Sequence, residues 1–130
     1  MKILVIEDSN FLRIALERGL VRAGYLVNTA SDGVEGVRAV REITPDLVLL
    51  DMMLPTLSGL DVLRELKKEA STTNIPVIAL TSLSERNKEK LLNEGASAYV
   101  EKSGTMLENN CAALIGAIVR VIGKATAAKA

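Results

Sequence analysis

Acidic, hydroxyl and lysine side chains stand directly after short apolar runs of this 130-residue chain. Glu7 and Asp8 follow the first run, and Asp51 follows the third. The fourth run leads into Thr81 and the fifth leads to Lys102. In open sheets of parallel strands, functional side chains gather beyond the carboxyl ends of the strands. The spacing therefore predicts one pocket that holds three carboxylates, a hydroxyl and a lysine.

A cluster of three carboxylates needs a compensating cation. Two carboxylates about 4 Å apart repel by roughly 4 kcal/mol at an effective dielectric constant of 20. The chain has no His, and Cys111 is its only cysteine, so the usual zinc and copper ligands are absent. Oxygen ligands from Glu7, Asp8 and Asp51 favour Mg²⁺, which keeps several waters that a phosphate can replace.

Asp51 is the residue with the clearest chemical assignment. It stands alone after the third apolar run, which places it at the centre of the predicted sheet edge. A carboxylate in this position can attack phosphorus and form an acyl phosphate. A metal ion and Lys102 would neutralise the phosphoryl oxygens, and the Thr81 hydroxyl would donate to a third oxygen.

The elements that position these residues alternate along the chain. Apolar runs that do not alternate with polar residues predict parallel strands buried on both faces. Amphipathic stretches between them predict helices, and the whole pattern predicts a doubly wound α/β sheet. The expected strands are Lys2–Ile6, Leu26–Ala30, Leu47–Leu50, Val77–Leu80 and Ala98–Val100, and the expected helices cover about 12–23, 33–41, 59–70, 84–93 and 107–122. Ser58 is expected to cap the third helix, and Cys111 falls on the apolar face of the last helix, so we interpret it as a core residue.

Composition and charge restrict the class of protein. Hydrophobic residues make up 48% and charged residues 25%, and 16 basic side chains balance 16 acidic ones. This composition predicts a soluble globular domain with no general affinity for nucleic acid or a membrane surface. No apolar run approaches the roughly 20 residues that cross a bilayer, and Glu7 and Asp8 interrupt any secretory signal. We predict a cytoplasmic protein with one domain over residues 1–122 and a frayed tail or linker stub over 123–130, which leaves no room for a DNA-binding output domain within this chain.

Four motifs resemble the receiver domain of two-component response regulators, the CheY-like family. The similarity extends over about residues 2–122. It implies a flavodoxin-like single sheet of five parallel strands in the order 2-1-3-4-5, flanked by five helices. The motifs are Ile3-Leu4-Val5-Ile6-Glu7-Asp8, Leu49-Leu50-Asp51 with Pro55 and Gly59 at fixed offsets, Ala79-Leu80-Thr81-Ser82, and Gly95-Ala96 leading to Tyr99 and Lys102.

The resemblance also implies a role for each site residue. Asp51 would be the phosphoacceptor, and Glu7, Asp8 and the backbone carbonyl of Met53 would hold Mg²⁺ together with Asp51. Thr81 would be the switch hydroxyl, Lys102 the phosphate-binding lysine and Tyr99 the aromatic residue whose rotamer follows Thr81.

The implied cycle requires a partner that supplies the histidine this chain lacks. That partner would be a sensor histidine kinase or a histidine-containing phosphotransfer protein. Phosphorylation would change the surface of the fourth helix, fifth strand and fifth helix, where a downstream protein or output domain binds. Direct contact with nucleic acid or membrane is not expected, and a phosphorylation-dependent dimer is an open alternative. Such a domain is a signalling protein with self-phosphorylation and self-dephosphorylation chemistry rather than an enzyme.

Departures from the family pattern leave other interpretations open. Ser103 stands where the family has a proline after the lysine, which puts the geometry of the Lys102–Ser103 bond in question. Met53 and Leu83 are apolar and cannot orient an attacking water, so we expect slow hydrolysis of the aspartyl phosphate. A receiver-like docking module that works without phosphate is the main alternative. An aspartyl phosphatase would need a second aspartate where Met53 stands, and a flavin site would need a phosphate-cradling loop after the first strand.

Overall fold

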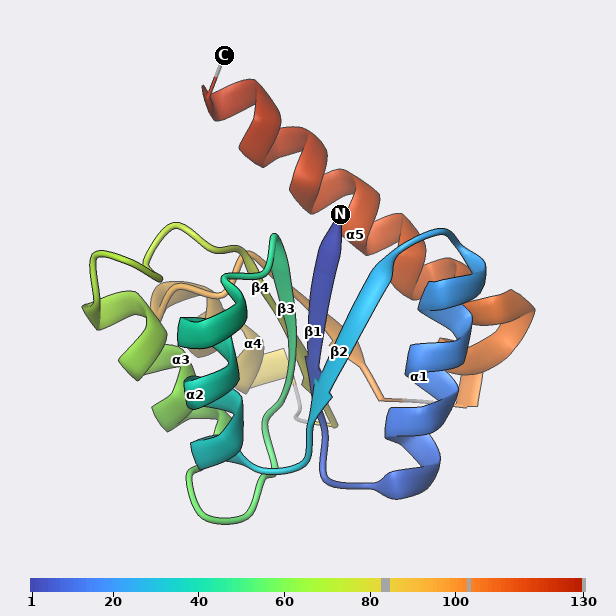
Figure 1. Cartoon of the computed structure of the whole chain (residues 1–130), viewed down its shortest axis with the longest axis horizontal. Coiled ribbons are helices and arrows are strands. Elements are labelled where there is room, and N and C mark those ends of the chain that lie inside the picture. Colours follow the sequence, from blue (N-terminus) through green and yellow to red (C-terminus); the bar gives the residue numbers. More distant parts are fainter. Residues whose placement is uncertain (83–84, 103, 130) are drawn as a thin grey trace.

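The computed structural model describes residues 1–82, 85–102 and 104–129, and Figure 1 shows how strands and helices alternate along the chain. Each predicted strand is present, and the helices follow them in the expected order. The strands are β1 (Lys2–Ile6), β2 (Leu26–Ala30), β3 (Leu47–Asp51), β4 (Val77–Thr81) and β5 (Ala98–Glu101). The helices are α1 (Asn10–Arg22), α2 (Gly33–Ile43), α3 (Gly59–Lys68), α4 (Glu85–Asn93), the 3₁₀ turn η1 (Gly104–Leu107) and α5 (Glu108–Lys129).

The five strands form one parallel sheet in the order β2-β1-β3-β4-β5. This topology is the flavodoxin-like order that the resemblance to the receiver family implied. All residues of β3 and β4 are buried, as expected for Leu, Val and Ile runs covered by helices on both faces. The parallel register places the ends of β1, β3, β4 and β5 at one edge of the sheet, which is the lower edge in Figure 1.

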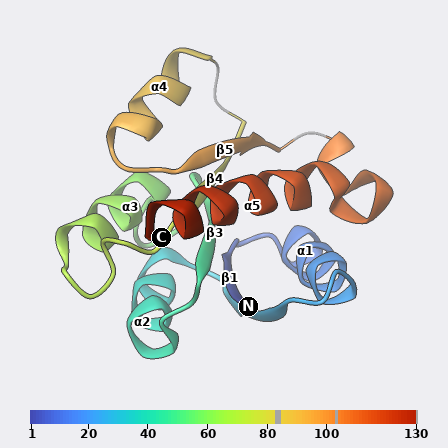
Figure 2. The ribbon, with the colours of Figure 1, turned by 90° about the horizontal axis from the view of Figure 1, so that it is seen from above.

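Two hydrophobic layers enclose the sheet. One core packs the sheet against α1 and α5, and the other packs it against α2, α3 and α4. Figure 2 shows this division from above, with α1 and α5 together and α2 and α3 on the other side. Cys111 belongs to the first core and is 2% exposed, so the prediction that it is a packing residue is confirmed.

Three helices begin at side chains that cap their first turn. The side chains of Ser9, Asp32 and Ser58 each accept one hydrogen bond from the backbone N–H of the residue three positions later. The cap predicted at Ser58 is therefore confirmed. Because α1 and α3 start shortly after β1 and β3, these caps fix the two loops that carry the acidic residues.

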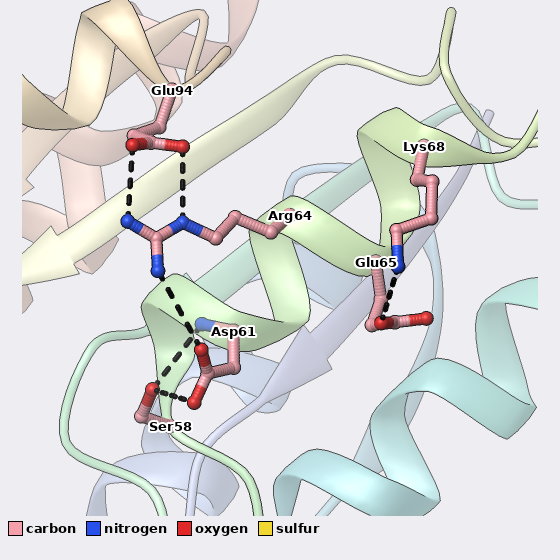
Figure 3. Close-up of polar contacts among 6 residues, drawn as sticks. All are labelled: Ser58, Asp61, Arg64, Glu65, Lys68 and Glu94. Atoms are coloured by element: carbon pink, nitrogen blue, oxygen red, sulfur yellow. Dashed lines mark hydrogen bonds and ion pairs between the residues drawn. The ribbon is translucent and has the colours of Figure 1, made fainter.

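Polar contacts on the outer surface of α3 link this helix to the end of α4 (Figure 3). The guanidinium of Arg64 donates two hydrogen bonds of 3.1 Å to the Glu94 carboxylate, and it also lies 3.8 Å from Asp61. The planar fork of arginine suits this bidentate geometry. The contact ties α3 to the turn that leads from α4 into β5.

The structure extends several elements beyond their predicted ends. The strands β3, β4 and β5 each continue for one residue, so Asp51 and Thr81 are the last members of their strands and take part in the ladder. The helical backbone of α5 continues through Lys129, past the predicted boundary at residue 122, and the assignment of residues 123–130 as a tail or linker stub stays a prediction. A left-handed turn at Asn109, Asn110 and Cys111 interrupts the start of that helix. No helix in the described ranges is both long enough and apolar enough to span a bilayer.

Candidate functional site

Three carboxylates converge at the carboxyl edge of the sheet. Glu7 directly follows β1, where its N–H donates to the Ala30 carbonyl at 3.0 Å. Asp51 ends β3 in register with Leu80 of β4. One oxygen from each of Glu7, Asp8 and Asp51 lies within 4.8 Å of the others. The structure therefore brings together the three acids that the sequence assigned to one pocket.

Lys102 reaches into this acidic cluster from the end of β5. Its Nζ lies 2.8 Å from Glu7 Oε1 and 3.2 Å from Asp51 Oδ1. Its backbone N–H donates to the Thr81 carbonyl at 2.9 Å, which extends the β4–β5 ladder past the last paired residues. Thr81 is buried at the end of β4, so the hydroxyl and the lysine are held by neighbouring strands.

Burial and mutual contact set the charges in the pocket. Burial raises the pKa of Glu7 to about 7, the neighbouring Asp51 carboxylate adds to the rise, and Lys102 opposes it. Burial also disfavours the charged form of Asp51, but contacts with Glu7, the Met53 N–H and Lys102 together lower the pKa of this carboxyl. Burial works against the charge of Lys102, yet its two acidic partners raise its pKa. Asp51 and Lys102 are therefore charged near neutral pH, whereas the Glu7 carboxyl holds its proton to a higher pH than an ordinary glutamate does.

The acidic cluster has the donor set of a site for a hard divalent cation. Glu7 Oε2 and Asp51 Oδ2 are buried and accept no hydrogen bond from the residues that the structure describes. Buried carboxylate oxygens without partners are costly, and one lysine does not compensate three acids. A set made only of oxygen ligands fits Mg²⁺ better than zinc or copper. The Met53 N–H donates to Asp51 Oδ1 at 3.0 Å, and the proposed ligand role of the Met53 carbonyl stays a prediction.

Asp51 is enclosed more tightly than the sequence suggested. Its side chain is 1% exposed and lies beneath Lys102, whose side chain is 23% exposed. Asp8 and Met53, in contrast, are exposed. Asp51 is therefore almost closed to solvent, with the Lys102 ammonium against its Oδ1.

Arg13 is a member of the site that the motifs did not single out. Its Nη1 donates to the Glu7 carbonyl at 3.0 Å and to the Asp8 carbonyl at 3.4 Å. It holds the backbone of the acidic loop from the first turns of α1. The only signal in the sequence was a basic residue within two helical turns of an acidic pair. This pattern is too common on helix surfaces to identify one functional residue.

Tyr99 lies one strand away from the acidic cluster. It pairs in register with Ala79, two residues before Thr81, and is 37% exposed. The Nζ of Lys88 in α4 lies 4.8 Å from the centre of the Tyr99 ring, within the range of a cation–π contact. Lys88 therefore stabilises the outward position of this ring.

Three sequence expectations fall on residues that the structure does not describe. Leu83 and Ser103 lie outside the described residues, and so does the Lys102–Ser103 bond. Ser84, the predicted first residue of the fourth helix, also lies outside them.

Comparisons with known proteins agree with this fold. The family model described as the response regulator receiver domain matches residues 3–109, which include the acids, Thr81, Tyr99 and Lys102. The response regulator DivK of Brucella anthropi is 37% identical over 102 residues, which cover 77% of this chain and 82% of DivK. The solved structure of the chemotaxis response regulator CheY4 of Vibrio cholerae superposes with a TM-score of 0.83 at 26% identity and covers 92% of this chain and 97% of that one.

The chain belongs to the response-regulator receiver domain family of two-component systems. Members of this family are signalling domains rather than conventional enzymes. The transcriptional regulatory protein AfsQ1 of Streptomyces coelicolor is 40% identical over 101 residues, and this chain spans 44% of its length. The chain spans 6% of the hybrid signal transduction histidine kinase D of Dictyostelium discoideum, which is also 40% identical over 101 residues.

Proposed function

We propose that Asp51 accepts a phosphoryl group from the phosphohistidine of a sensor histidine kinase or a phosphotransfer protein. The observation that carries this proposal is the cluster of Glu7, Asp8, Asp51 and Lys102, in which buried carboxylate oxygens lack hydrogen-bond partners. In the proposed step an Asp51 oxygen forms a bond to phosphorus. The bond from phosphorus to the histidine nitrogen breaks, and that nitrogen keeps the electron pair.

The residues of this chain would divide the work of the transfer. Glu7, Asp8, Asp51 and the Met53 carbonyl would hold Mg²⁺, which when bound supplies Lewis-acid neutralisation of the phosphoryl charge. Lys102 would leave Asp51 Oδ1 and pair with a phosphoryl oxygen, because its pKa keeps it charged. The Met53 N–H, which donates to Asp51, would keep the carboxylate oriented.

The output of the domain would depend on Thr81 and Tyr99. A phosphoryl group on Asp51 adds negative charge that attracts the Thr81 hydroxyl and Lys102. Displacement of Thr81 would leave space for the Tyr99 ring to turn inward and change the surface formed by α4, β5 and α5. This surface would bind a downstream protein or output domain. Phosphorylation needs only to shift the populations of two existing conformations by a few kcal/mol; dimerisation and a cytoplasmic location stay predictions.

Acetyl phosphate tests whether Asp51 is the acceptor. With Mg²⁺, the parent protein should gain the mass of one phosphoryl group, and Asp51→Asn should gain none. Asp61→Asn is a matched control, because Asp61 is an exposed acid on α3 whose side chain is 52% exposed. A phosphoryl group on Asp51→Asn, or none on the parent, would contradict the proposal.

Fluoroberyllate separates this function from a docking module that works without phosphate. With Mg²⁺, fluoroberyllate should perturb the amide signals of Thr81 and Tyr99 in the parent protein. An unchanged spectrum would favour the docking module. This measurement does not depend on the rate of phosphorylation.

Met53 should prolong the life of the aspartyl phosphate. Its side chain is 69% exposed next to Asp51 and has no group that orients a water molecule. We expect Met53→Asn to hydrolyse about two- to tenfold faster, because a carboxamide can hydrogen-bond an attacking water. The half-life is measured by intact mass after the donor is removed. Val119→Asn, at an exposed position on α5, should keep the parent half-life; equal half-lives for Met53→Asn and the parent would refute the effect.

The contact between Lys88 and Tyr99 should oppose activation. The cation–π interaction favours the exposed ring and contributes about 0.5–1 kcal/mol at such a site. Lys88→Gln should therefore bind fluoroberyllate with Mg²⁺ about two- to fivefold more tightly in a titration followed by the Tyr99 amide signal. Lys90→Gln, an exposed change on the same helix, should bind like the parent. Weaker or unchanged binding by Lys88→Gln would show that the contact does not restrain the ring.

A further inference from the structure

A second cavity of about 490 Å³ lies away from the acidic site, at the other end of the sheet. It is bounded by the start of β4, the start of β5, the segment after α3 and the C-terminal half of α5. Its size falls within the range of cavities that hold small organic molecules. None of the residues proposed to bind Mg²⁺ or the phosphoryl group lines it.

The charge of this cavity departs from the neutral balance of the chain. Lys67 and Arg120 line it, and no acidic side chain is among the described residues that surround it. Neither cation forms an ion pair within the part of the chain that the structure describes. The other two basic residues of α3, Arg64 and Lys68, both have acidic partners (Figure 3).

Lys67 is held in place rather than free in solvent. Its Nζ donates to the carbonyls of Thr73 at 2.9 Å and Ile75 at 2.8 Å, which leaves one ammonium N–H unused. Its stem lies against Gly95, where a Cβ atom would come within 2.9 Å of the lysine Cγ. A cation fixed in this way loses little conformational entropy when an anion binds.

The remaining walls combine apolar surface with hydrogen-bonding groups. Pro76, Ala98, Ala117 and Val121 supply the apolar part, and the two alanines and Val121 are at least partly buried. Tyr99 adds an aromatic wall, which favours a flat ligand.

We propose that this cavity binds a small organic anion, in which a carboxylate or phosphate on a flat apolar body pairs with Lys67 and Arg120. The arginine fork matches a planar carboxylate or a phosphate, and the apolar walls accept the body. The cavity shares no residue with the acidic cluster, and the inference concerns the unphosphorylated protein, in which Tyr99 lines the cavity.

Three probes test the two halves of the proposal. Naphthalene-2-carboxylate carries both features, naphthalene-2-carboxamide has the body without the charge, and inorganic phosphate has a charge without the body. The carboxylate should give saturable shifts of the Thr73, Ser97 and Val121 amide signals in metal-free protein, with a Kd of about 0.1–1 mM. The other two probes should bind at least tenfold more weakly, and the Asp8 and Met53 amides should not move. Equal binding of the carboxamide or of phosphate, or no saturation by the carboxylate, would overturn the proposal.

Variants locate the anion. Arg120 is exposed, so Arg120→Gln should fold normally and bind the carboxylate about tenfold more weakly. Lys67→Met should weaken binding to a similar extent. Lys68→Gln is the matched control, because Lys68 is the adjacent lysine on α3 and does not line the cavity. Undiminished binding by Arg120→Gln would overturn the proposal even if Lys67→Met fails to fold.

Discussion

Lys102→Met should bind Mg²⁺ at least tenfold more tightly than the parent protein and accept a phosphoryl group at least a hundredfold more slowly. Lys102 Nζ lies 2.8 Å from Glu7 and 3.2 Å from Asp51. The ammonium group would therefore compete with Mg²⁺ for the same carboxylates. Two unit charges about 4 Å apart interact by roughly 4 kcal/mol at an effective dielectric constant of 20. Loss of the Lys102 charge therefore favours binding of Mg²⁺ to the acids. Methionine keeps most of the length of the side chain but not its charge.

The slower phosphorylation has a separate cause. Without Lys102 no ammonium group pairs with the phosphoryl oxygen as charge develops, and loss of one such donor costs about 10²–10³ in rate. Tighter metal binding combined with slower transfer is the distinguishing result, because a misfolded pocket would weaken both. Calorimetry gives the Mg²⁺ affinity, and intact mass against time gives the rate with acetyl phosphate.

Lys68→Met is the control for the loss of a positive charge. Lys68 is 72% exposed and pairs at the surface with Glu65 at 3.4 Å. This variant should match the parent in Mg²⁺ affinity and in phosphorylation rate. If Lys102→Met bound Mg²⁺ no more tightly than Lys68→Met, the lysine would not compete with a cation for the acidic cluster.

The sheet and its edge could be predicted because each depends on local patterns. Apolar runs without polar alternation identify buried strands, and parallel strands bring residues such as Asp51 and Lys102 to one edge whatever the details of the loops. The predicted strands differ from the observed ones by one residue at most. The last helix was harder to delimit, because its helical backbone continues to Lys129 after the core-facing positions end near residue 122.

Contacts between distant segments could not be predicted in this way. The role of Arg13 depends on the path of two backbone carbonyls after β1, and the contact of Lys88 with Tyr99 depends on how α4 packs beside β5. The cavity at Lys67 and Arg120 joins residues more than 50 positions apart, with no motif to connect them. Burial of Asp51 beneath Lys102 likewise follows from side-chain packing, which sequence periodicity does not report.

Gly59→Ala should both destabilise the domain and impair the acceptor site. Gly59 is the first residue of α3, and its N–H donates to the Met52 carbonyl at 3.2 Å. A Cβ atom at this position would lie 2.3 Å from the Asp51 carbonyl oxygen and 2.4 Å from Met52 Cα. Both neighbours are backbone atoms of the strand end that carries the acceptor, so they cannot turn aside as a flexible side chain would.

The cost of this substitution follows from the overlap. Overpacking in a well-packed region costs about 1–3 kcal/mol, and the clash with backbone places Gly59→Ala at the upper end. For a domain of this size the melting temperature should fall by about 10 °C. Displacement of Asp51 by about 1 Å should slow phosphorylation by acetyl phosphate roughly a hundredfold.

Gly123→Ala separates the clash from the general effect of removing a glycine. Gly123 lies in α5, and a Cβ atom there would meet nothing within 4 Å. Alanine is the better helix former by about 1 kcal/mol, so this variant should be as stable as the parent or more stable and should be phosphorylated at the parent rate. Calorimetric melting and intact mass against time compare the three proteins. If Gly59→Ala melts and reacts like Gly123→Ala, the backbone after Asp51 adjusts to the added methyl group without loss of stability. The close approach of α3 would then have no part in holding the acceptor in place.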